Sequence, residues 1–281
     1  MVSEMKMLSN EDFNRLGQFI QNGYGIKMPD NKKTMLQARL QKRLRTLGLD
    51  SFHDYCDLVL SSPDYDYEIV NMIDAVTTNK TEFFREPVHF SYLVKTALPA
   101  VIKHWKVHSK KMIKIWSAGC STGEEPYTIA MIVDDFLKNY PDFNFAILAT
   151  DLSTQVLDKA RTAIYPEDRI SPVPMEFKHR YLLKSTNREL KQVRIVPQLR
   201  SRVTFAQLNF MDDVYPLKDE MDIVFCRNVI IYFEKHIQEN IVNKLTAHLR
   251  TDGYLFMGHS ETLFSLKVPV RQAAPTIYQK N

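Results

Sequence analysis

The sequence predicts an α/β protein: a doubly wound, mostly parallel sheet that follows an all-helical domain and carries a small antiparallel β insertion. Three patterns in the 281 residues indicate this fold. Helical apolar spacing dominates the N-terminal quarter, strands and helices alternate from about residue 111, and short alternating runs interrupt that rhythm at about 180–205. We therefore expect one domain over residues 1–75 and a second over residues 76–281.

The N-terminal domain is predicted from apolar side chains at helical spacing, with no strand pattern among them. Leu36, Leu40, Leu44 and Leu47 recur every three or four residues, which places them on one buried face of a helix. Gly48 marks the end of that helix. The pattern predicts four helices, over residues 12–21, 29–47, 55–60 and 67–76.

The second domain is predicted from regular alternation. Strands are expected over residues 111–116, 145–150, 221–226 and 253–258. Helices are expected over residues 124–137, 154–163 and 235–249. Because a crossover helix joins each strand to the next in this pattern, the strands run parallel and the helices cover both faces of the sheet.

Residues 164–207 break the alternation. Three prolines come early in this segment, and three short runs with alternating character follow at residues 181–183, 192–196 and 202–205. Such runs are typical of half-buried strands. We expect an antiparallel appendage at about 180–205, inserted in the larger domain.

Composition excludes several classes of protein. The net charge is +4, from 37 basic and 33 acidic residues, so nothing in it calls for a nucleic-acid partner. The longest apolar runs, such as residues 228–233, fall far short of the roughly 20 residues of a membrane span, so no membrane insertion is expected. The first residues mix charges without an apolar core, so no secretory signal is predicted.

Cysteine and histidine usage gives no reason to expect a metal. Cys56, Cys120 and Cys226 are too few for a disulfide framework and lack close-paired metal spacing. His104 and His108 are four residues apart but have no third ligand nearby, so they are interpreted as surface histidines. The chain is expected to work in the reducing cytoplasm.

A ligand site is predicted where the strands end, because open parallel sheets bind ligands beyond their carboxyl ends. The first strand leads into a loop with Gly119 and Gly123, two of only eight glycines in the chain, which suggests a backbone that closely approaches something. The second strand ends at Asp151, whose carboxylate can accept hydrogen bonds from two ribose hydroxyls. The third strand ends in polar residues 226–228.

The helix after the glycine loop opens with Glu124 and Glu125. Two carboxylates at a helix N-terminus repel a phosphate and suit a cationic ligand. S-adenosylmethionine has a ribose, an ammonium and a sulfonium but no phosphate, so the charge favours it over NAD, FAD or ATP. The alternative is that the glutamates only compensate the helix dipole and that the glycines only form turns.

Four segments in this order carry a resemblance to a known family: TTNKTEFFRE at residues 77–86, WSAGCSTGEEPY at 116–127, FCRNVIIYF at 225–233 and GHSE at 258–261. They resemble the signature of CheR-type chemoreceptor glutamate methyltransferases, and the similarity runs from about residue 10 to about residue 278. It implies a Rossmann-like methyltransferase fold that uses S-adenosylmethionine, releases S-adenosylhomocysteine and methyl-esterifies glutamate side chains of bacterial chemoreceptors for sensory adaptation.

The resemblance also implies individual residue roles. The implied cofactor contacts are Asn79, Thr81, Arg85, Glu125, Asp151, Asn209, Phe210, Arg227 and Asn228. Arg85 and Tyr232 match the catalytic positions that handle substrate near the transferred methyl group. The family often has leucine where Phe210 stands, and its contact there is expected through the backbone. Trp116 and Ser117 precede the glycine loop, where many other methyltransferases have an acidic residue.

The implied reaction is an in-line displacement in which a glutamate oxygen attacks the methyl group. Free glutamate has a pKa of about 4.3 and is ionised at neutral pH, so no general base is required. The enzyme must hold the carboxylate near the methyl group and remove its water. Arg85 can bind a carboxylate as a fork, and Tyr232 can donate one hydrogen bond.

The helix predicted over residues 29–47 is basic, because residues 31–49 contain six basic and no acidic side chains. The candidates for substrate docking are Lys32, Arg39, Lys42, Arg43 and Arg45. The resemblance implies that the partner is the glutamate-rich helical bundle of chemoreceptors, to which a basic helix would be attracted. The alternative is an ordinary solvated helix face.

In some members of the family, the β appendage binds a receptor's C-terminal tail by strand addition. Here the turn at residues 185–188 lacks the glycines of some tail-binding members, so tail binding stays open. The rival functions are a methyltransferase for RNA or a small molecule, a non-catalytic adaptor and an NAD enzyme, the last disfavoured by Glu124 and Glu125. The expected protein is a cytoplasmic enzyme that is recruited to membrane-bound receptor arrays.

Overall fold

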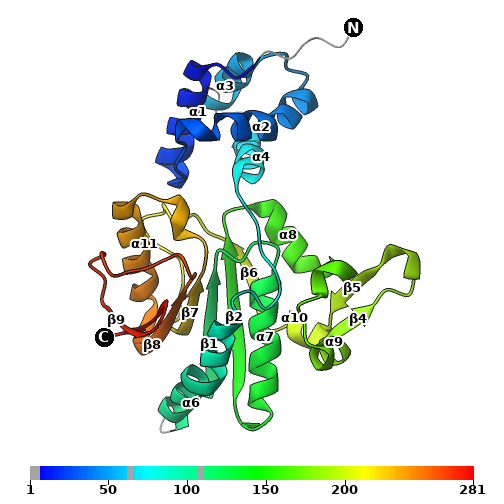
Figure 1. Ribbon diagram of the computed structural model, residues 1–281, viewed down its shortest axis with the longest axis vertical. Helices are drawn as coiled ribbons and strands as arrows, with labels where there is room; N and C mark the ends of the chain where they lie inside the picture. Colours follow the sequence, from blue (N-terminus) through cyan, green and yellow to red (C-terminus); the bar gives the residue numbers. More distant parts are fainter. Residues whose placement is uncertain (1–6, 62–65, 107–110) are drawn as a thin grey trace.

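The computed structural model describes residues 7–61, 66–106 and 111–281. His108 lies outside these ranges. The chain forms a helical unit joined by an extended segment to a large α/β unit, from which a small β unit projects (Figure 1). Among the described residues, no helix combines the length and the apolar character needed to cross a membrane.

The N-terminal unit contains the four predicted helices. They are α1 (Asn10–Tyr24), α2 (Lys33–Leu47, preceded by the 3-10 turn η1, Asp30–Lys32), α3 (Phe52–Ser61) and α4 (Asp66–Val76). Ser9 caps α1 by accepting a hydrogen bond from the Asp12 N–H, and Gly48 ends α2 in the left-handed conformation. The predicted leucine face is confirmed, because Leu36, Leu40 and Leu44 are fully buried.

The segment after α4 runs across the end of the large sheet before it forms further helices. These are α5 (Pro87–Tyr92), the π-turn η3 (Leu93–Ala97) and α6 (Leu98–Lys106). Glu86 stands at the N-cap of α5 with a positive φ of 58°, a conformation that is uncommon for a non-glycine residue. The backbone therefore turns sharply at Glu86, where the connecting segment meets the α/β unit.

The large sheet has seven strands in the order β6-β2-β1-β7-β8-β10-β9. They are β1 (Met112–Ala118), β2 (Asn144–Asp151), β6 (Val203–Gln207), β7 (Met221–Cys226), β8 (Leu249–Met257), β9 (Val270–Ala274) and β10 (Ile277–Lys280). All pairs from β6 to β8 are parallel, and β10 and β9 add an antiparallel edge. The predicted doubly wound, mostly parallel sheet is confirmed.

The helices of this unit are α7 (Glu124–Leu137), α8 (Thr154–Thr162) and α11 (Lys235–Ala247). They lie on the two faces of the sheet, and β7 is buried along its whole length between them. Ile223 and Phe225 belong to one apolar core, whereas Val224 and Cys226 belong to the other. The chain passes from β1 to β2 and β6 on one side and then returns to β7 on the other. The topological switch therefore lies between the ends of β1 and β7.

The insertion is a separate antiparallel sheet in the order β3-β5-β4. Its strands are β3 (Ile164–Pro166), β4 (Leu182–Lys184) and β5 (Gln192–Ile195), with short helices η4 (Glu167–Ile170), α9 (Met175–Tyr181), η5 (Arg188–Leu190) and α10 (Pro197–Arg200) around them. It begins earlier in the chain than predicted, because Ile164–Pro166 forms one of its edges.

The assignment of residues 202–205 to this appendage is wrong. That run forms β6, which pairs in parallel with β2 from Ile147↔Val203 to Asp151↔Gln207 and closes one edge of the large sheet. A short edge strand with one exposed face has the same alternation as a strand of an antiparallel appendage, so its periodicity could not distinguish the two.

Candidate functional site

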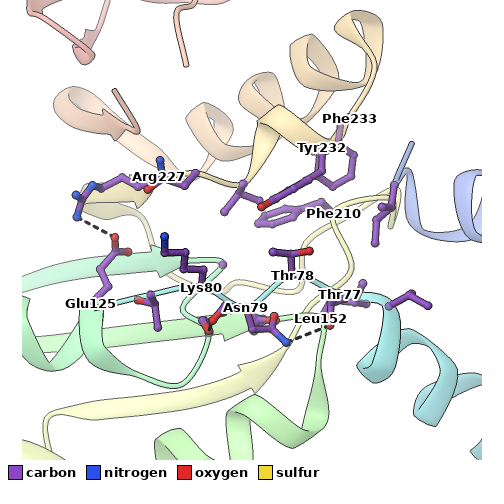
Figure 2. Close-up of a pocket in the computed structure, with 18 of the residues that line it drawn as sticks. Thr77, Thr78, Asn79, Lys80, Glu125, Leu152, Phe210, Arg227, Tyr232 and Phe233 are labelled. Carbon is purple, nitrogen blue, oxygen red and sulfur yellow. Dashed lines mark hydrogen bonds and ion pairs between the residues drawn. The ribbon is translucent and has the colours of Figure 1, made fainter. Parts of the chain in front are cut away.

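The ends of β1, β2 and β7 open into one cavity of about 1090 Å³, counted with its open mouth. It is lined by all nine predicted cofactor residues and by Tyr232. Figure 2 labels Asn79, Glu125, Phe210, Arg227 and Tyr232 among them. The helical unit supplies one wall, which includes Tyr24, Ile26, Lys32, Met35 and Val76. Segments from both units and from the connection between them therefore converge on a single site.

The glycine loop follows β1 and lies against the loop after β7. Gly119 has a φ of 87°, and a Cβ there would lie 2.4 Å from Val229 Cγ2. Gly123 has a φ of 97°, and its Cβ would lie 2.8 Å from the Tyr165 hydroxyl. The backbone at both glycines is therefore closely approached, as predicted. The groups that approach it are side chains of this protein, Val229 and Tyr165. Gly119 still lines the cavity and presents backbone to it.

Asp151 ends β2 at the floor of the cavity, and its carboxylate is fixed by two backbone groups. Its Oδ2 accepts from the Ser121 N–H at 2.8 Å, and its Oδ1 accepts from the Ser153 N–H at 3.0 Å. Burial raises the pKa of Asp151 above its usual value, and the N–H groups of Ser153 and Ser121 oppose that rise. Each oxygen retains a lone pair for a further donor, which suits the two hydroxyls of a ribose.

The two glutamates that begin α7 point in different directions. Glu125 lines the cavity, where its Oε1 accepts from Ser117 Oγ at 2.7 Å. Glu124 is buried away from it and accepts from Thr122 Oγ1 at 2.6 Å. Burial raises the pKa of both carboxyls, and at Glu125 the guanidinium of Arg227 opposes the rise. Of the two glutamates, Glu125 is therefore the one whose carboxylate faces the cavity.

Arg227 follows β7 and is buried, and its guanidinium contacts both the start of α7 and the connecting segment. Its Nη1 lies 3.1 Å from Glu125 Oε2, its Nη2 lies 2.9 Å from Glu86 Oε2, and Nη2 also donates to the Arg85 carbonyl. Burial by itself would raise the pKa of Glu86, but the charge and hydrogen bonds of Arg227, together with smaller contributions from His259, lower the pKa of that carboxyl below its usual value. Arg227 thus joins the connecting segment to the ends of β1 and β7.

Sequence reasoning missed Glu86 and Glu261, although both lie in the segments that carry the family resemblance. Glu261 is 3% exposed and accepts from the N–H groups of Asn228, Val229 and Gly258 at 2.7–2.8 Å. It holds Asn228 at a positive φ of 59°. The signal that could have found Glu261 is an acidic side chain four residues after the end of a buried strand.

Arg85 and Tyr232 lie on the cavity wall, as the resemblance implies. Arg85 Nη1 donates to the Lys80 carbonyl at 3.0 Å, and the Tyr232 carbonyl accepts from the Lys27 N–H at 3.0 Å. Lys32 Nζ lies 5.8 Å from the centre of the Tyr232 ring. Burial lowers the pKa of Lys32, with smaller contributions from the charges of Arg39 and Lys27.

The remaining predicted cofactor residues make local contacts or contacts between segments. Asn79 Nδ2 donates to Thr77 Oγ1 at 3.2 Å (Figure 2), and the Thr81 carbonyl accepts from Arg169 at 3.2 Å. Asn209 Nδ2 donates to the Gly23 carbonyl of the helical unit at 2.8 Å. Phe210 presents its mostly buried ring to the cavity.

The predicted docking residues divide into three groups. Lys32 lines the cavity, whereas Lys42 and Arg45 are exposed on α2. Arg39 Nη1 binds the carbonyls of residues 76 and 77 at 2.5 and 2.9 Å. Arg43 binds the fully buried Glu68 through Nε at 2.9 Å and Nη2 at 2.5 Å. Arg39 and Arg43 therefore have partners inside the helical unit.

A doubly wound sheet with a strand-end carboxylate and a glycine loop on one cavity defines an α/β enzyme that binds a nucleoside cofactor at its switch point. Residues 11–77 match the family described as CheR methyltransferase, all-alpha domain, and residues 79–278 match CheR methyltransferase, SAM binding domain. The chain belongs to the CheR methyltransferase family, and its cofactor is S-adenosylmethionine, as predicted. The donor set at Asp151 fits the ribose of that group.

Three bacterial chemotaxis protein methyltransferases are similar to this chain over nearly their whole length. A chemotaxis protein methyltransferase of Borreliella burgdorferi is 38% identical over 277 residues, which cover 98% of this chain and 95% of the relative. The chemotaxis protein methyltransferase of Escherichia coli is 36% identical over 277 residues, which cover 99% of this chain and 93% of the relative. Chemotaxis protein methyltransferase 2 of Pseudomonas aeruginosa is 36% identical over 270 residues, covering 96% and 93%.

Proposed function

We propose that this protein transfers the methyl group of S-adenosylmethionine to glutamate carboxylates of bacterial chemoreceptors and so produces methyl esters. The observation that carries the proposal is the convergence of Asp151, Arg85 and Tyr232 on one open cavity in a chain of the CheR methyltransferase family. The cofactor supplies an electrophilic methyl group on a positively charged sulfur. The chemistry left to the protein is binding, orientation and exclusion of water.

Each wall of the cavity has a separate task in this mechanism. Asp151, Asn79 and the Gly119 backbone bind the nucleoside end of the cofactor, and Glu125 offers negative charge to its cationic end. Arg85 and Tyr232 orient the incoming carboxylate with N–H and O–H donors. Because that carboxylate is ionised at neutral pH, none of these residues has to remove a proton.

Receptor docking is proposed for the helical domain over residues 1–75, with catalysis in the domain over residues 76–281. Lys42 and Arg45 are the exposed cations on α2 that can attract a glutamate-rich helical bundle. Lys32, just before the start of α2, adds a positive charge on the cavity wall. The protein then works in the cytoplasm, recruited to membrane-bound receptor arrays.

The β insertion offers a second docking place, for the C-terminal tail of a receptor. Its sheet ends at β3 on one side and β4 on the other, so either strand has an edge at which an extended peptide can add. Leu183 on β4 is half exposed beside that edge, which gives a tail residue an apolar contact.

The proposal is tested with S-adenosylmethionine that carries a labelled methyl group and with membranes that contain one candidate receptor. The expected result is label on receptor glutamates that mild base releases as methanol, because methyl esters hydrolyse in base. Membranes in which the acceptor glutamates are replaced by alanine are the control. Label that resists base, or label that appears equally in the control membranes, would contradict glutamate esterification.

A further inference from the structure

A second cluster of polar side chains lies beside Arg227. Glu86, His89 and His259 each offer one donor atom, and these three atoms lie within 4.8 Å of one another. Glu86 and His89 come from the start of α5, and His259 follows the end of β8. The two histidines are far apart in the chain, so no sequence spacing could indicate that they meet.

The distances in this cluster suit a small metal ion. Glu86 Oε2 lies 3.4 Å from His89 Nδ1 and 4.0 Å from His259 Nε2. A tetrahedral site with bonds of about 2.1 Å places its ligand atoms about 3.4 Å apart. The first pair has this separation, and the His259 side chain, 56% exposed, can close the remaining gap by a small rotation.

The environment of His89 is a second, independent observation that indicates a bound ion. The residue is 1% exposed, yet its Nδ1 has no hydrogen-bond partner among the described residues. Its Nε2 lies 2.9 Å from Thr276 Oγ1, which can accept the ring hydrogen and leave a lone pair on Nδ1. A histidine that binds a metal through one nitrogen typically donates the hydrogen of the other to an oxygen.

We propose that Glu86, His89 and His259 form a binding site for a divalent transition-metal ion of the Zn²⁺ type. The ion competes with Arg227 for Glu86 and so weakens binding of the cofactor. Two imidazole nitrogens and one carboxylate oxygen are a common ligand set for Zn²⁺. The neighbouring charges allow a cation, because the single charge of Arg227 already faces two carboxylates, Glu86 and Glu125.

The ion and Arg227 compete because both bind the same oxygen of Glu86. Glu86 Oε2 accepts from Arg227 Nε at 3.2 Å and Nη2 at 2.9 Å, and the same oxygen is the proposed metal ligand. Arg227 lines the cofactor cavity and holds the Arg85 carbonyl. An ion on Glu86 therefore loosens a wall of the cavity. Because linkage is reciprocal, cofactor binding must weaken metal binding by the same factor.

The experiment titrates the untagged, metal-free full-length protein with Zn²⁺ in a calorimeter. His259→Ala removes one proposed ligand. His53→Ala is the matched control, because His53 is 61% exposed and also lies beside carboxylates, those of Asp12 and Asp57. All three cysteines are buried, so thiols do not add a competing surface site. We expect one Zn²⁺ per chain, with affinity at least about tenfold lower in His259→Ala and unchanged in His53→Ala.

A second titration measures the affinity for S-adenosylhomocysteine with and without saturating Zn²⁺, in the absence of any receptor. We expect Zn²⁺ to lower that affinity several-fold in the wild type. At the lowest Zn²⁺ concentration that saturates the wild type, the effect in His259→Ala should be smaller, because the variant binds the ion more weakly. Equal Zn²⁺ affinity in all three proteins would overturn the site, and unchanged S-adenosylhomocysteine affinity would overturn the competition. Neither result depends on methyl transfer to receptors, so failure here is distinguishable from failure of the proposed function.

Discussion

At the scale of single residues, the cavity relies on a few buried carboxylates with fixed partners. Asp151 is oriented by backbone N–H groups, Glu125 by Arg227, and Glu261 by the backbone of the loop after β7. Burial raises the pKa of each, and their hydrogen-bond donors oppose the rise. Because these partners hold the carboxylates in place before ligands arrive, little ordering is left for the moment of binding.

Asp151→Asn keeps the shape of the side chain and removes its charge. Two hydrogen bonds from a ribose to a charged group contribute about 1.5–3 kcal/mol each, so the affinity for S-adenosylhomocysteine should fall at least about tenfold. In the wild type the affinity should decline as the pH falls through the raised pKa of Asp151, since protonation removes the same charge. Calorimetry across pH measures both effects. An identical pH profile in Asp151→Asn would contradict the assigned role.

Arg85→Ala should leave the fold intact and reduce kcat/KM for methyl transfer by about a hundredfold, because the attacking carboxylate loses its orienting donor. Arg271→Ala is the control, since Arg271 is an exposed arginine on β9, remote from the cavity. Thermal unfolding and initial rates with labelled donor provide the two readouts. Wild-type rates in Arg85→Ala would remove this residue from the site.

At the scale of elements, α2 combines structural and exposed cations on one helix. Arg43 compensates the buried charge of Glu68, whose Oε1 also accepts from the Tyr55 hydroxyl at 3.0 Å. Lys42, the next residue along the helix, is exposed. The sequence predicts a basic helix but does not reveal that one charge supports the fold and its neighbour faces solvent, because the partner comes from α4.

Arg43→Ala should lower the free energy of unfolding by about 3 kcal/mol, since Glu68 is left buried without its partner. Lys42→Ala should change it by no more than about 0.5 kcal/mol. Urea unfolding of both variants measures the difference. Equal free energies of unfolding for the two variants would contradict the assigned role of Arg43 in compensating the buried Glu68.

Reversal of the exposed charges tests docking apart from folding. The double variant Lys42→Glu, Arg45→Glu should raise KM for the receptor about fivefold and leave kcat unchanged. This change corresponds to a loss of about 1 kcal/mol in the free energy of receptor binding. The effect should shrink as salt rises, because salt screens exposed charges. Kinetics at low and high salt provide the measurement. The same KM as wild type at low salt would leave α2 without a part in docking.

At the scale of the whole molecule, the cavity exists because the two units touch. The Lys27 N–H donates to the Tyr232 carbonyl, and Asn209 donates to the Gly23 carbonyl. At this contact Gly25 has a φ of 70°, and a Cβ there would lie 2.6 Å from Met211 Sδ and from Phe233 Cδ1. A side chain at this position would be strained by the positive φ and would force the side chains of Met211 and Phe233 to move.

Gly25→Ala should therefore displace the wall formed by the helical unit and lower the affinity for S-adenosylhomocysteine several-fold. Gly23→Ala is a close control, because a Cβ at Gly23 meets no atom within 4 Å. Calorimetry gives the affinity, and small-angle scattering reports whether the units move apart. Equal affinity in the two variants would mean that the helical unit does not shape the cofactor site.

The sequence by itself determined the α/β class, the four N-terminal helices, the parallel strands and the segments that contribute to the cavity. These features follow from local periodicity and from short motifs, and both can be recognised in the linear sequence. It also indicated S-adenosylmethionine, because the charge at the start of α7 and the acid at the end of β2 lie within short segments.

Only the tertiary structure decided the rest. It placed residues 203–207 in the large sheet, paired Arg43 with Glu68, joined Arg227 to Glu86 and brought His89 beside His259. Each of these contacts joins residues that are distant in the chain. The physical reason is that pairing and burial depend on which surfaces meet after folding, and no periodicity within a single segment records the identity of a partner.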